Sequence, residues 1–287
     1  MDKRNFLKGL VASTVGLSTG SIPAAAWAGL AQGPHRTYSS DLQRRTSSRK
    51  IIGIGGGGCN AVSAFLLSNV DEQPARITAE FICIDVDMQS LSYVQAVRQK
   101  SPSALPVRTI LLSPYGAGGQ VNDARVAAFT HVELLNATVS DADAVMLVTG
   151  LGGGTGSAIA PIMARLARNA GAASFALVVT PFDFEGPPRN RTSDIAIRHL
   201  EREADFVVRV SNQELADTMG DDTFMSDLSV AQEQRIATYI RAFLVTKPLD
   251  QPNGRRVRGA ALVWLHGHGE RGGRRDLRLD KEPCQLS

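Results

Sequence analysis

Two glycine clusters, about a hundred residues apart, constrain this chain more than any other feature. The first runs Gly53-Ile54-Gly55-Gly56-Gly57-Gly58 and the second Gly150-Leu151-Gly152-Gly153-Gly154-Thr155-Gly156. Each follows an apolar run and precedes a stretch with helical spacing of apolar residues, which is typical of a turn from strand to helix. Backbone N–H groups at such a helix N-terminus attract anions. The clusters therefore predict a protein that binds phosphate groups, most simply a nucleotide.

From Lys50 onward, the apolar residues predict strands that alternate with helices. The strands are expected at residues 51–54, 81–84, 109–112, 144–148, 174–179 and 206–210, and the helices at 60–68, 124–136, 158–169, 192–204 and 228–245. This alternation favours an α/β fold of Rossmann-like type, with a mostly parallel sheet and helices on both faces. Ligands of such sheets bind at the carboxyl ends of the strands, where both glycine clusters fall.

The segments outside this pattern are expected to flank the domain. Residues 1–32 resemble a twin-arginine export signal, with Lys3 in place of the first arginine. Residues 33–49 are interpreted as a linker, 50–246 as the nucleotide-binding domain and 247–287 as a basic, disordered tail rich in Gly and Arg. A decayed or frameshifted gene is the alternative explanation of that tail. No segment predicts a transmembrane span.

Charge and cysteine content exclude several classes of protein. The formal net charge of +3 comes from the basic flanks, and the region between them is acidic, so no nucleic-acid surface is predicted for the domain. The three cysteines, Cys59, Cys83 and Cys284, have no CxxC spacing, which favours reduced thiols over structural zinc. The pair His266 and His268 lacks a third ligand, so no metal site is predicted.

The glycine clusters also discriminate between kinds of nucleotide site. The first one alone fits the GxGxxG fingerprint, with Asp85 or Asp87 as a partner for a ribose hydroxyl, so an NAD(P)- or FAD-dependent oxidoreductase is an alternative. A Walker A loop is excluded because neither cluster ends in Gly-Lys-Ser/Thr. A second glycine-rich turn is not needed for a dinucleotide. Two turns favour a triphosphate held by backbone amides from both sides.

Three motifs in this order resemble the FtsZ/tubulin family of GTPases. They are Ile-Gly-Ile-Gly-Gly-Gly-Gly-Cys-Asn-Ala-Val at 52–62, Gly-Gly-Gly-Thr-Gly-Ser at 152–157 and Pro-Phe-Asp-Phe-Glu-Gly at 181–186. The resemblance covers about residues 50–245. It implies GTP or GDP as the ligand, with Mg2+ left open as a companion ion, and a relation to cell division or cytoskeletal filaments.

The resemblance also implies a set of nucleotide-binding residues. Glycine loops would hold the phosphates, Glu185 the ribose with Arg189 beside it, Asn212 would bind the guanine edge, and Phe224 would stack on the base. The complete set is Gly55, Gly56, Gly57, Gly58, Asn60, Asp87, Gly116, Gly118, Gly153, Gly154, Thr155, Gly156, Glu185, Arg189, Asn212 and Phe224. Arg125 matches the arginine that opens the next helix. No catalytic residue and no metal ligand is assigned.

Several positions depart from the family pattern. Ala158 replaces a glycine, and Pro187 and Pro188 replace basic residues before Arg189. Ser229 stands where the family uses an aspartate against the purine, so one acceptor pair for guanine is lost. An unpaired polar edge costs about 1–3 kcal/mol, which leaves the base selectivity open.

The largest departure concerns hydrolysis. In the family, an Asn-x-Asp-x-x-Asp loop from the second domain of the next subunit completes the site, and nothing after Leu244 has this pattern. Asp250 is its only partial match. We therefore expect a GTP-binding protein that associates with FtsZ-like subunits, with GTPase activity and polymerisation weakened or dependent on a partner. A protein that caps filaments without hydrolysis is the alternative. The need for GTP favours the cytoplasm over export.

Overall fold

The computed structural model describes residues 48–68, 79–100, 106–113, 115–220 and 222–245. The predicted export signal, most of the linker, the basic tail, Cys284 and the histidine pair lie outside these residues. Two compact units divide the chain at residue 250, and all described residues belong to the first.

Six parallel strands form one sheet in the order β3-β2-β1-β4-β5-β6. They are β1 (Arg49–Ile54), β2 (Ala79–Asp85), β3 (Val107–Leu111), β4 (Ala144–Gly150), β5 (Ala173–Thr180) and β6 (Phe206–Ser211). The predicted α/β fold is thus confirmed, and each neighbouring pair of strands is parallel. The order reverses between β1 and β4, and this switch point is where open α/β sheets bind ligands.

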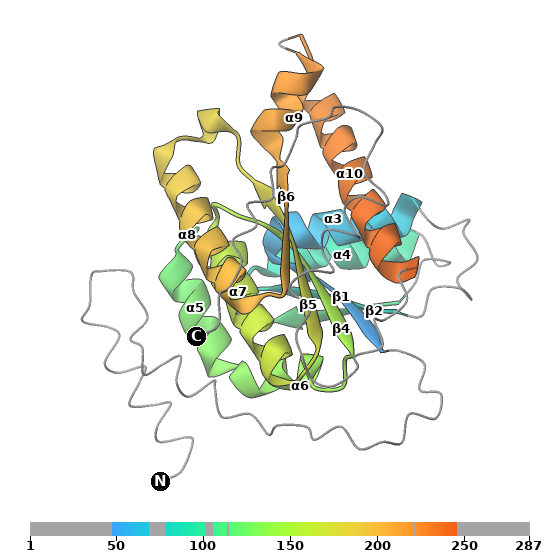
Figure 1. Ribbon diagram of the computed structural model, residues 1–287, viewed down its shortest axis with the longest axis vertical. Helices are drawn as coiled ribbons and strands as arrows, with labels where there is room; N and C mark the ends of the chain where they lie inside the picture. The colour runs from blue at the N-terminus through green and yellow to red at the C-terminus, as the bar shows by residue number, and fades with distance from the viewer. Residues whose placement is uncertain (1–47, 69–78, 101–105, 114, 221, 246–287) are drawn as a thin grey trace, which may run out of the picture. The chain divides into compact units, whose positions relative to one another are not determined.

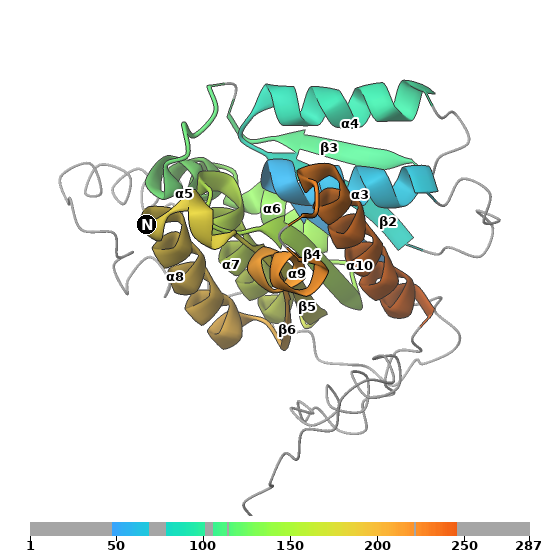
Figure 2. The ribbon, with the colours of Figure 1, turned by 90° about the horizontal axis from the view of Figure 1, so that it is seen from above.

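Helices cover both faces of the sheet (Figures 1 and 2). One face carries α3 (Gly55–Ser68), α4 (Met88–Lys100) and α10 (Met225–Val245). The other carries α5 (Val121–Thr130), α6 (Val132–Val139), α7 (Gly154–Asn169) and α8 (Pro187–Glu203). The short α9 (Asn212–Met219) follows β6 and leads towards α10. No helix in the described ranges combines the length and apolar character needed to cross a membrane.

The core lies on both faces of the sheet because successive side chains of β1 point to opposite sides. Ile52 packs in the cluster that contains Ile159 and Met163 of α7. Ile51 packs in the other cluster with Phe65 of α3 and Ile240 of α10. A strand buried on both faces carries a continuous apolar run, which explains the pattern that predicted these strands.

The helix prediction at 124–136 was wrong in detail. The single helix expected at 124–136 is two helices, α5 and α6, with a break at His131, whose N–H donates to the carbonyl of Ala127. Val126 is exposed, whereas Ala124 and Ala128 are fully buried. Small side chains let α5 pack closely on α7, so the buried face follows the alanines and not the larger apolar residues.

Other boundaries differ because of local chemistry. α3 begins at Gly55, five residues before the predicted start at Asn60, so the glycines form its first turn. Neither α4 nor α9 was predicted. α4 has little hydrophobic periodicity, and α9 begins directly at the end of β6, where the hydroxyl of Ser211 accepts a hydrogen bond from the N–H of Glu214 at 3.1 Å. This is an N-cap, which starts a helix without an apolar signal.

Charged side chains join the amino end of β1 to its neighbours. Arg49 donates hydrogen bonds to the carbonyls of Phe243 and Leu244 at the end of α10. The buried ammonium group of Lys50 lies 2.6 Å from Asp141 and 3.1 Å from Glu80. The Lys50 hydrogen bond is the main reason that the pKa of Asp141 is lowered. The glycine loops lie at the opposite end of the same strand.

Candidate nucleotide-binding site

The first glycine loop fits directly against the backbone of β4. Gly55 has a φ of +71°, in the left-handed region that favours glycine. A Cβ atom on Gly58 would lie only 2.1 Å from the carbonyl oxygen of Val148. This turn of α3 therefore has no room for a side chain at Gly58. The first N–H groups of the helix have no carbonyl partner within it and are available to a ligand.

The second glycine loop makes an equally close contact with itself. A Cβ atom on Gly156 would lie 2.2 Å from the carbonyl oxygen of Gly150 and 2.4 Å from the hydroxyl of Thr149. The loop is closed by a hydrogen bond of 3.0 Å from the N–H of Gly152 to the hydroxyl of Ser157. The N-terminus of α7 is thus held close to the end of β4.

The two loops lie side by side. A Cβ atom on Gly55 would be 3.1 Å from the backbone nitrogen of Gly156 and 3.3 Å from the Cβ of Thr155. The hydroxyl of Thr149 also donates to the carbonyl of Ile54, at 3.1 Å. The N-termini of α3 and α7 therefore meet at one end of the sheet (Figure 1). Each carries the positive end of its helix dipole, so together they favour negative charge and form the candidate site for an anion.

A third loop, which precedes α5, closes this site on the α7 side. Gly116 and Gly118 have φ values of +69° and +52°. A Cβ atom on Gly154 would lie 2.8 Å from the carbonyl carbon of Gly119 and 2.9 Å from the carbonyl oxygen of Gln120. The third glycine segment thus meets α7 through Gly119 and Gln120, whereas the predicted residues Gly116 and Gly118 make no comparably close contact.

Two aspartates near the end of β2 have different environments. The Asp87 carboxylate accepts a hydrogen bond of 2.9 Å from the N–H of Gln89, which caps α4. Asp85 is almost fully buried, and burial raises its pKa, although the N–H groups of Val86 and Asp87 and the nearby hydroxyls of Ser90 and Thr155 oppose the rise. Sequence reasoning assigned Asp87 to the site and considered Asp85 only for a dinucleotide. The packing of Thr155 over Asp85 could not be inferred from the spacing.

Glu185 and Arg189 form an ion pair beside the second glycine loop. The other carboxylate oxygen of Glu185 accepts a hydrogen bond of 2.9 Å from the N–H of Phe182. The carbonyl oxygen of Arg189 lies 3.1 Å from the position of a Cβ atom on Gly152. These contacts place Glu185 and Arg189, the two residues predicted to lie at the ribose, next to the second glycine loop.

The residues predicted to contact the base are more exposed. Asn212 is the first residue of α9, and its side-chain oxygen accepts a hydrogen bond of 2.7 Å from Gln232 of α10. This bond leaves the Asn212 amide donors for a ligand. Phe224 is 75% exposed, and Ser229 is exposed on α10 with its hydroxyl bonded to the carbonyl of Met225. Gln232 was not singled out from the sequence.

The remaining residues considered from the sequence lie on α3, α5, α7 and β2. Asn60 is exposed on α3. Arg125 lies on α5, and its charge acts on His199 of α8, whose pKa is lowered first by burial and then by Arg125. Ala158, which replaces a family glycine, is buried in the core beside α5 and is accommodated there. Cys59 and Cys83 are buried free thiols, as predicted.

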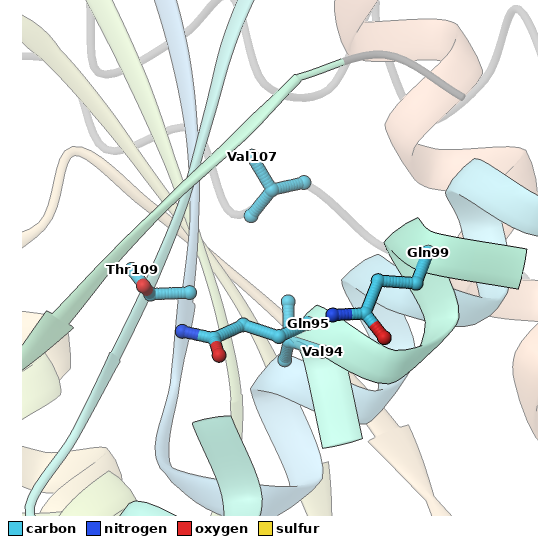
Figure 3. A pocket seen from close by; sticks show the side chains of 5 residues that line it. All are labelled: Val94, Gln95, Gln99, Val107 and Thr109. Carbon is cyan, nitrogen blue, oxygen red and sulfur yellow. The ribbon is translucent and has the colours of Figure 1, made fainter. Parts of the chain in front are cut away.

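A separate hollow of about 340 Å³ lies between α4 and β3. Its lining consists of Val94, Gln95, Gln99, Val107 and Thr109 (Figure 3). None of these residues belongs to the predicted site, and none is ionisable. The hollow therefore presents no cationic side chain to an anion.

Comparison with known proteins identifies the protein family of this domain. Residues 48–220 match the family model described as Tubulin/FtsZ family, GTPase domain. The chain belongs to the tubulin/FtsZ family. This match favours the GTPase domain over the alternative of a dinucleotide-dependent oxidoreductase.

Individual curated proteins with similar sequences support this family assignment. The cell division protein FtsZ of Pseudomonas aeruginosa is 36% identical over 180 residues, which are 62% of this chain and 42% of that protein. FtsZ of Pseudomonas putida is 30% identical over 226 residues, or 77% of this chain and 54% of that protein. The chain thus spans about half the length of the curated relatives it matches.

Solved structures support the fold. An FtsZ dimer of M. jannaschii superposes with a TM-score of 0.59 at 22% identity, over 73% of this chain and 59% of that chain. A GDP-bound monomer of CetZ1 from Haloferax volcanii gives a TM-score of 0.57 at 19% identity, over 70% of this chain and 62% of that chain. At these identities the likeness concerns the fold of the nucleotide-binding domain.

Proposed function

We propose that this domain binds GTP and GDP, with the phosphates held by backbone N–H groups of the two glycine loops. The observation that carries the proposal is the contact between the loops, where Gly55 lies against Thr155 and Gly156. Phosphates placed there would face the N-termini of α3 and α7 at once. The ion pair of Glu185 and Arg189 lies beside the loops, where a ribose attached to these phosphates would extend.

Equilibrium binding of fluorescently labelled nucleotides to the full chain tests this proposal. We expect GTP and GDP to bind with similar affinity, because backbone groups supply most of the phosphate contacts. ATP is expected to bind more weakly, because adenine cannot form the hydrogen bonds that the Asn212 amide is proposed to make with guanine. Absence of binding by any guanine nucleotide at millimolar concentration would refute it.

Mg2+ is proposed to accompany the triphosphate through the phosphate oxygens. Within the described ranges, no three His, Cys, Asp or Glu side chains lie close enough to hold a metal ion. Mg2+ in nucleotide sites usually keeps several waters and binds mainly through phosphates. Measurement of GTP affinity with Mg2+ and with a chelator checks this: a stronger affinity with Mg2+ is expected, and equal affinities would contradict it.

We further propose that GTP hydrolysis is weak in this chain alone and depends on a partner subunit. Phosphoryl transfer needs a group that positions the attacking water, and the sequence after Leu244 has no Asn-x-Asp-x-x-Asp loop to supply one to a neighbour. The glycine loops supply anion binding but no general base. We expect this group to come from an FtsZ-like subunit that contacts the glycine loops in a heterologous association.

Phosphate release, alone and in mixtures with a full-length FtsZ, tests partner dependence. We expect slow turnover alone and faster turnover per bound GTP in the mixture. Co-sedimentation of the mixture separates the two forms of association: incorporation supports a filament subunit, and shortened filaments without added turnover support a filament cap. Equal turnover with and without the partner, and no effect on its filaments, would contradict both.

The cytoplasm is the proposed location, because a protein that binds GTP needs a compartment that contains it. Fractionation of cells that express the tagged full chain tests this. Recovery with the cytoplasmic fraction is expected, and recovery of a shortened chain outside it would favour the export alternative.

A further inference from the structure

The carboxyl group of Asp85 lies beneath both glycine loops. Its side chain is within reach of the hydroxyls of Ser90 and Thr155, both of which act on its protonation. The hydroxyl of Ser90 lies 3.2 Å from the position of a Cβ atom on Gly56, and the Cβ of Thr155 lies 3.3 Å from that on Gly55. Asp85 therefore lies below the glycine loops, next to the proposed phosphate-binding position.

The two carboxyl oxygens of Asp85 are bonded differently. Oδ1 accepts hydrogen bonds from the N–H groups of Val86 and Asp87, at 2.7 and 3.2 Å. Oδ2 is buried and has no hydrogen bond of suitable geometry. Asp85 as a residue is only 1% exposed, so bulk water has little access to Oδ2. A buried acceptor without a partner is unfavourable, and a charged one more so.

No cation offsets this charge within the part of the chain that the structure describes, because none of the ion pairs found there includes Asp85. The elements around it contribute neutral or acidic groups. α4 and α7 contribute hydroxyls, and the end of β3 is followed by Leu112, whose N–H bonds to the Asp85 carbonyl. On α3, the thiol of Cys59 has a raised pKa, owing first to Cys83 and burial and also to the charge of Asp85. The next titratable group along the chain is Asp87, itself acidic.

Phosphates at the glycine loops would add negative charge directly above this buried carboxyl. Two like charges at close range disfavour ionisation of both groups. A proton on Oδ2 removes the repulsion and also turns the unpartnered acceptor into a hydrogen-bond donor.

We propose that Asp85 is a positioning residue that enters the nucleotide complex as a neutral carboxylic acid, so that binding takes up one proton from solvent. The proton binds to Oδ2, and no other bond forms or breaks. The Oδ2–H group then donates to the nearest acceptor, a phosphate oxygen or the Thr155 hydroxyl. The inference rests on the proposed nucleotide site and adds a proton linkage to it.

The direction of the pH dependence follows from two pKa values. Burial already raises the pKa of Asp85 in the free protein, and a bound phosphate raises it further. Between these two values, affinity falls about tenfold for each unit of rising pH, because one proton is taken up. Below the lower value and above the higher one, Asp85 adds no pH dependence.

Calorimetric titration of the full chain with GDP and GTP, in buffers of different ionisation enthalpy, counts the protons directly. The measurements cover about pH 5 to 8, the range in which buried carboxyl groups titrate. The wild type is expected to take up close to one proton beyond the titration of the nucleotide itself. Asp85→Asn keeps the size of the side chain, cannot ionise and should lose both the uptake and the pH slope. Asp194→Asn, on the exposed surface of α8, is the matched control and should retain both.

Each outcome decides the inference. Proton uptake that is equal in the wild type and in Asp85→Asn overturns it, as does nucleotide binding by the wild type without uptake across the whole pH range. If Asp85→Asn fails to fold, as judged by circular dichroism, the proton count of the wild type still decides. If the wild type binds no nucleotide, the proposed function itself fails, which is a different result from binding without proton uptake.

Discussion

The proposed phosphate half and the proposed nucleoside half of this site differ in how closely their residues are packed into the fold. The phosphate half consists of the glycine loops at 55–58, 116–120 and 150–156, in which Gly58, Gly154 and Gly156 lie so close to neighbouring backbone that a side chain is excluded. The nucleoside half consists of Glu185, Arg189, Asn212 and Phe224, of which Arg189 and Phe224 are exposed. Substitutions in the phosphate half are therefore expected to destabilise the fold, whereas substitutions in the nucleoside half are expected to leave the domain folded.

The largest expected effect is a substitution in the phosphate half. Gly58→Ala places a methyl group 2.1 Å from the Val148 carbonyl oxygen, so α3 must separate from β4. We expect a loss of at least about 3 kcal/mol in the free energy of unfolding, together with the loss of GTP binding. Denaturant unfolding followed by circular dichroism measures it.

The matched control for that change is Gly153→Ala. Gly153 has an ordinary φ of −91°, and a Cβ atom there would meet no atom within 4 Å. Its stability should stay within about 0.5 kcal/mol of the wild type. Equal losses of stability in Gly58→Ala and Gly153→Ala would contradict the claim that close backbone packing makes Gly58 the more sensitive position.

A smaller effect is expected from Arg189→Ala in the nucleoside half. The ion pair with Glu185 is partly exposed, and such pairs contribute about 0–1 kcal/mol to stability, so the melting temperature should hardly change. GTP and GDP affinity should both fall about tenfold if the pair holds the ribose, which corresponds to one charge-assisted hydrogen bond. Arg191→Ala, exposed on the same helix, is the control. A large loss of stability would place Arg189 with the phosphate half instead.

The smallest expected effect concerns base selectivity. Ser229→Asp adds a carboxylate near Asn212 and Gln232, which could accept hydrogen bonds from both N1–H and the 2-amino group of guanine. The ratio of GTP to ITP affinity should rise by about fivefold to tenfold, the value of one added hydrogen bond. Ser229→Asn offers a single acceptor and should raise the ratio less. An unchanged ratio in Ser229→Asp would remove position 229 from the base site.

This contrast also explains how much could be predicted from the sequence. Glycines in a strand-to-helix turn carry a local constraint, so the two glycine turns and the parallel sheet were predictable from spacing. Asp85 depends on the packing of α4 and α7 over β2, and the amide of Gln232 reaches Asn212 from a different helix. Such contacts join distant parts of the chain and leave no periodic signal. Val126 shows a second limit, because helix packing followed the small alanines beside it.

The central claim is that backbone N–H groups of both glycine loops hold one set of phosphates. It is tested most directly by nuclear magnetic resonance of the full chain with 15N-glycine, titrated with GDP. The account predicts that the amide signals of Gly55–Gly58 and of Gly153, Gly154 and Gly156 shift together at one dissociation constant. The signal of Gly171, in an exposed turn at the other end of α7, should not move. Shifts confined to one loop, or to neither, would contradict the account.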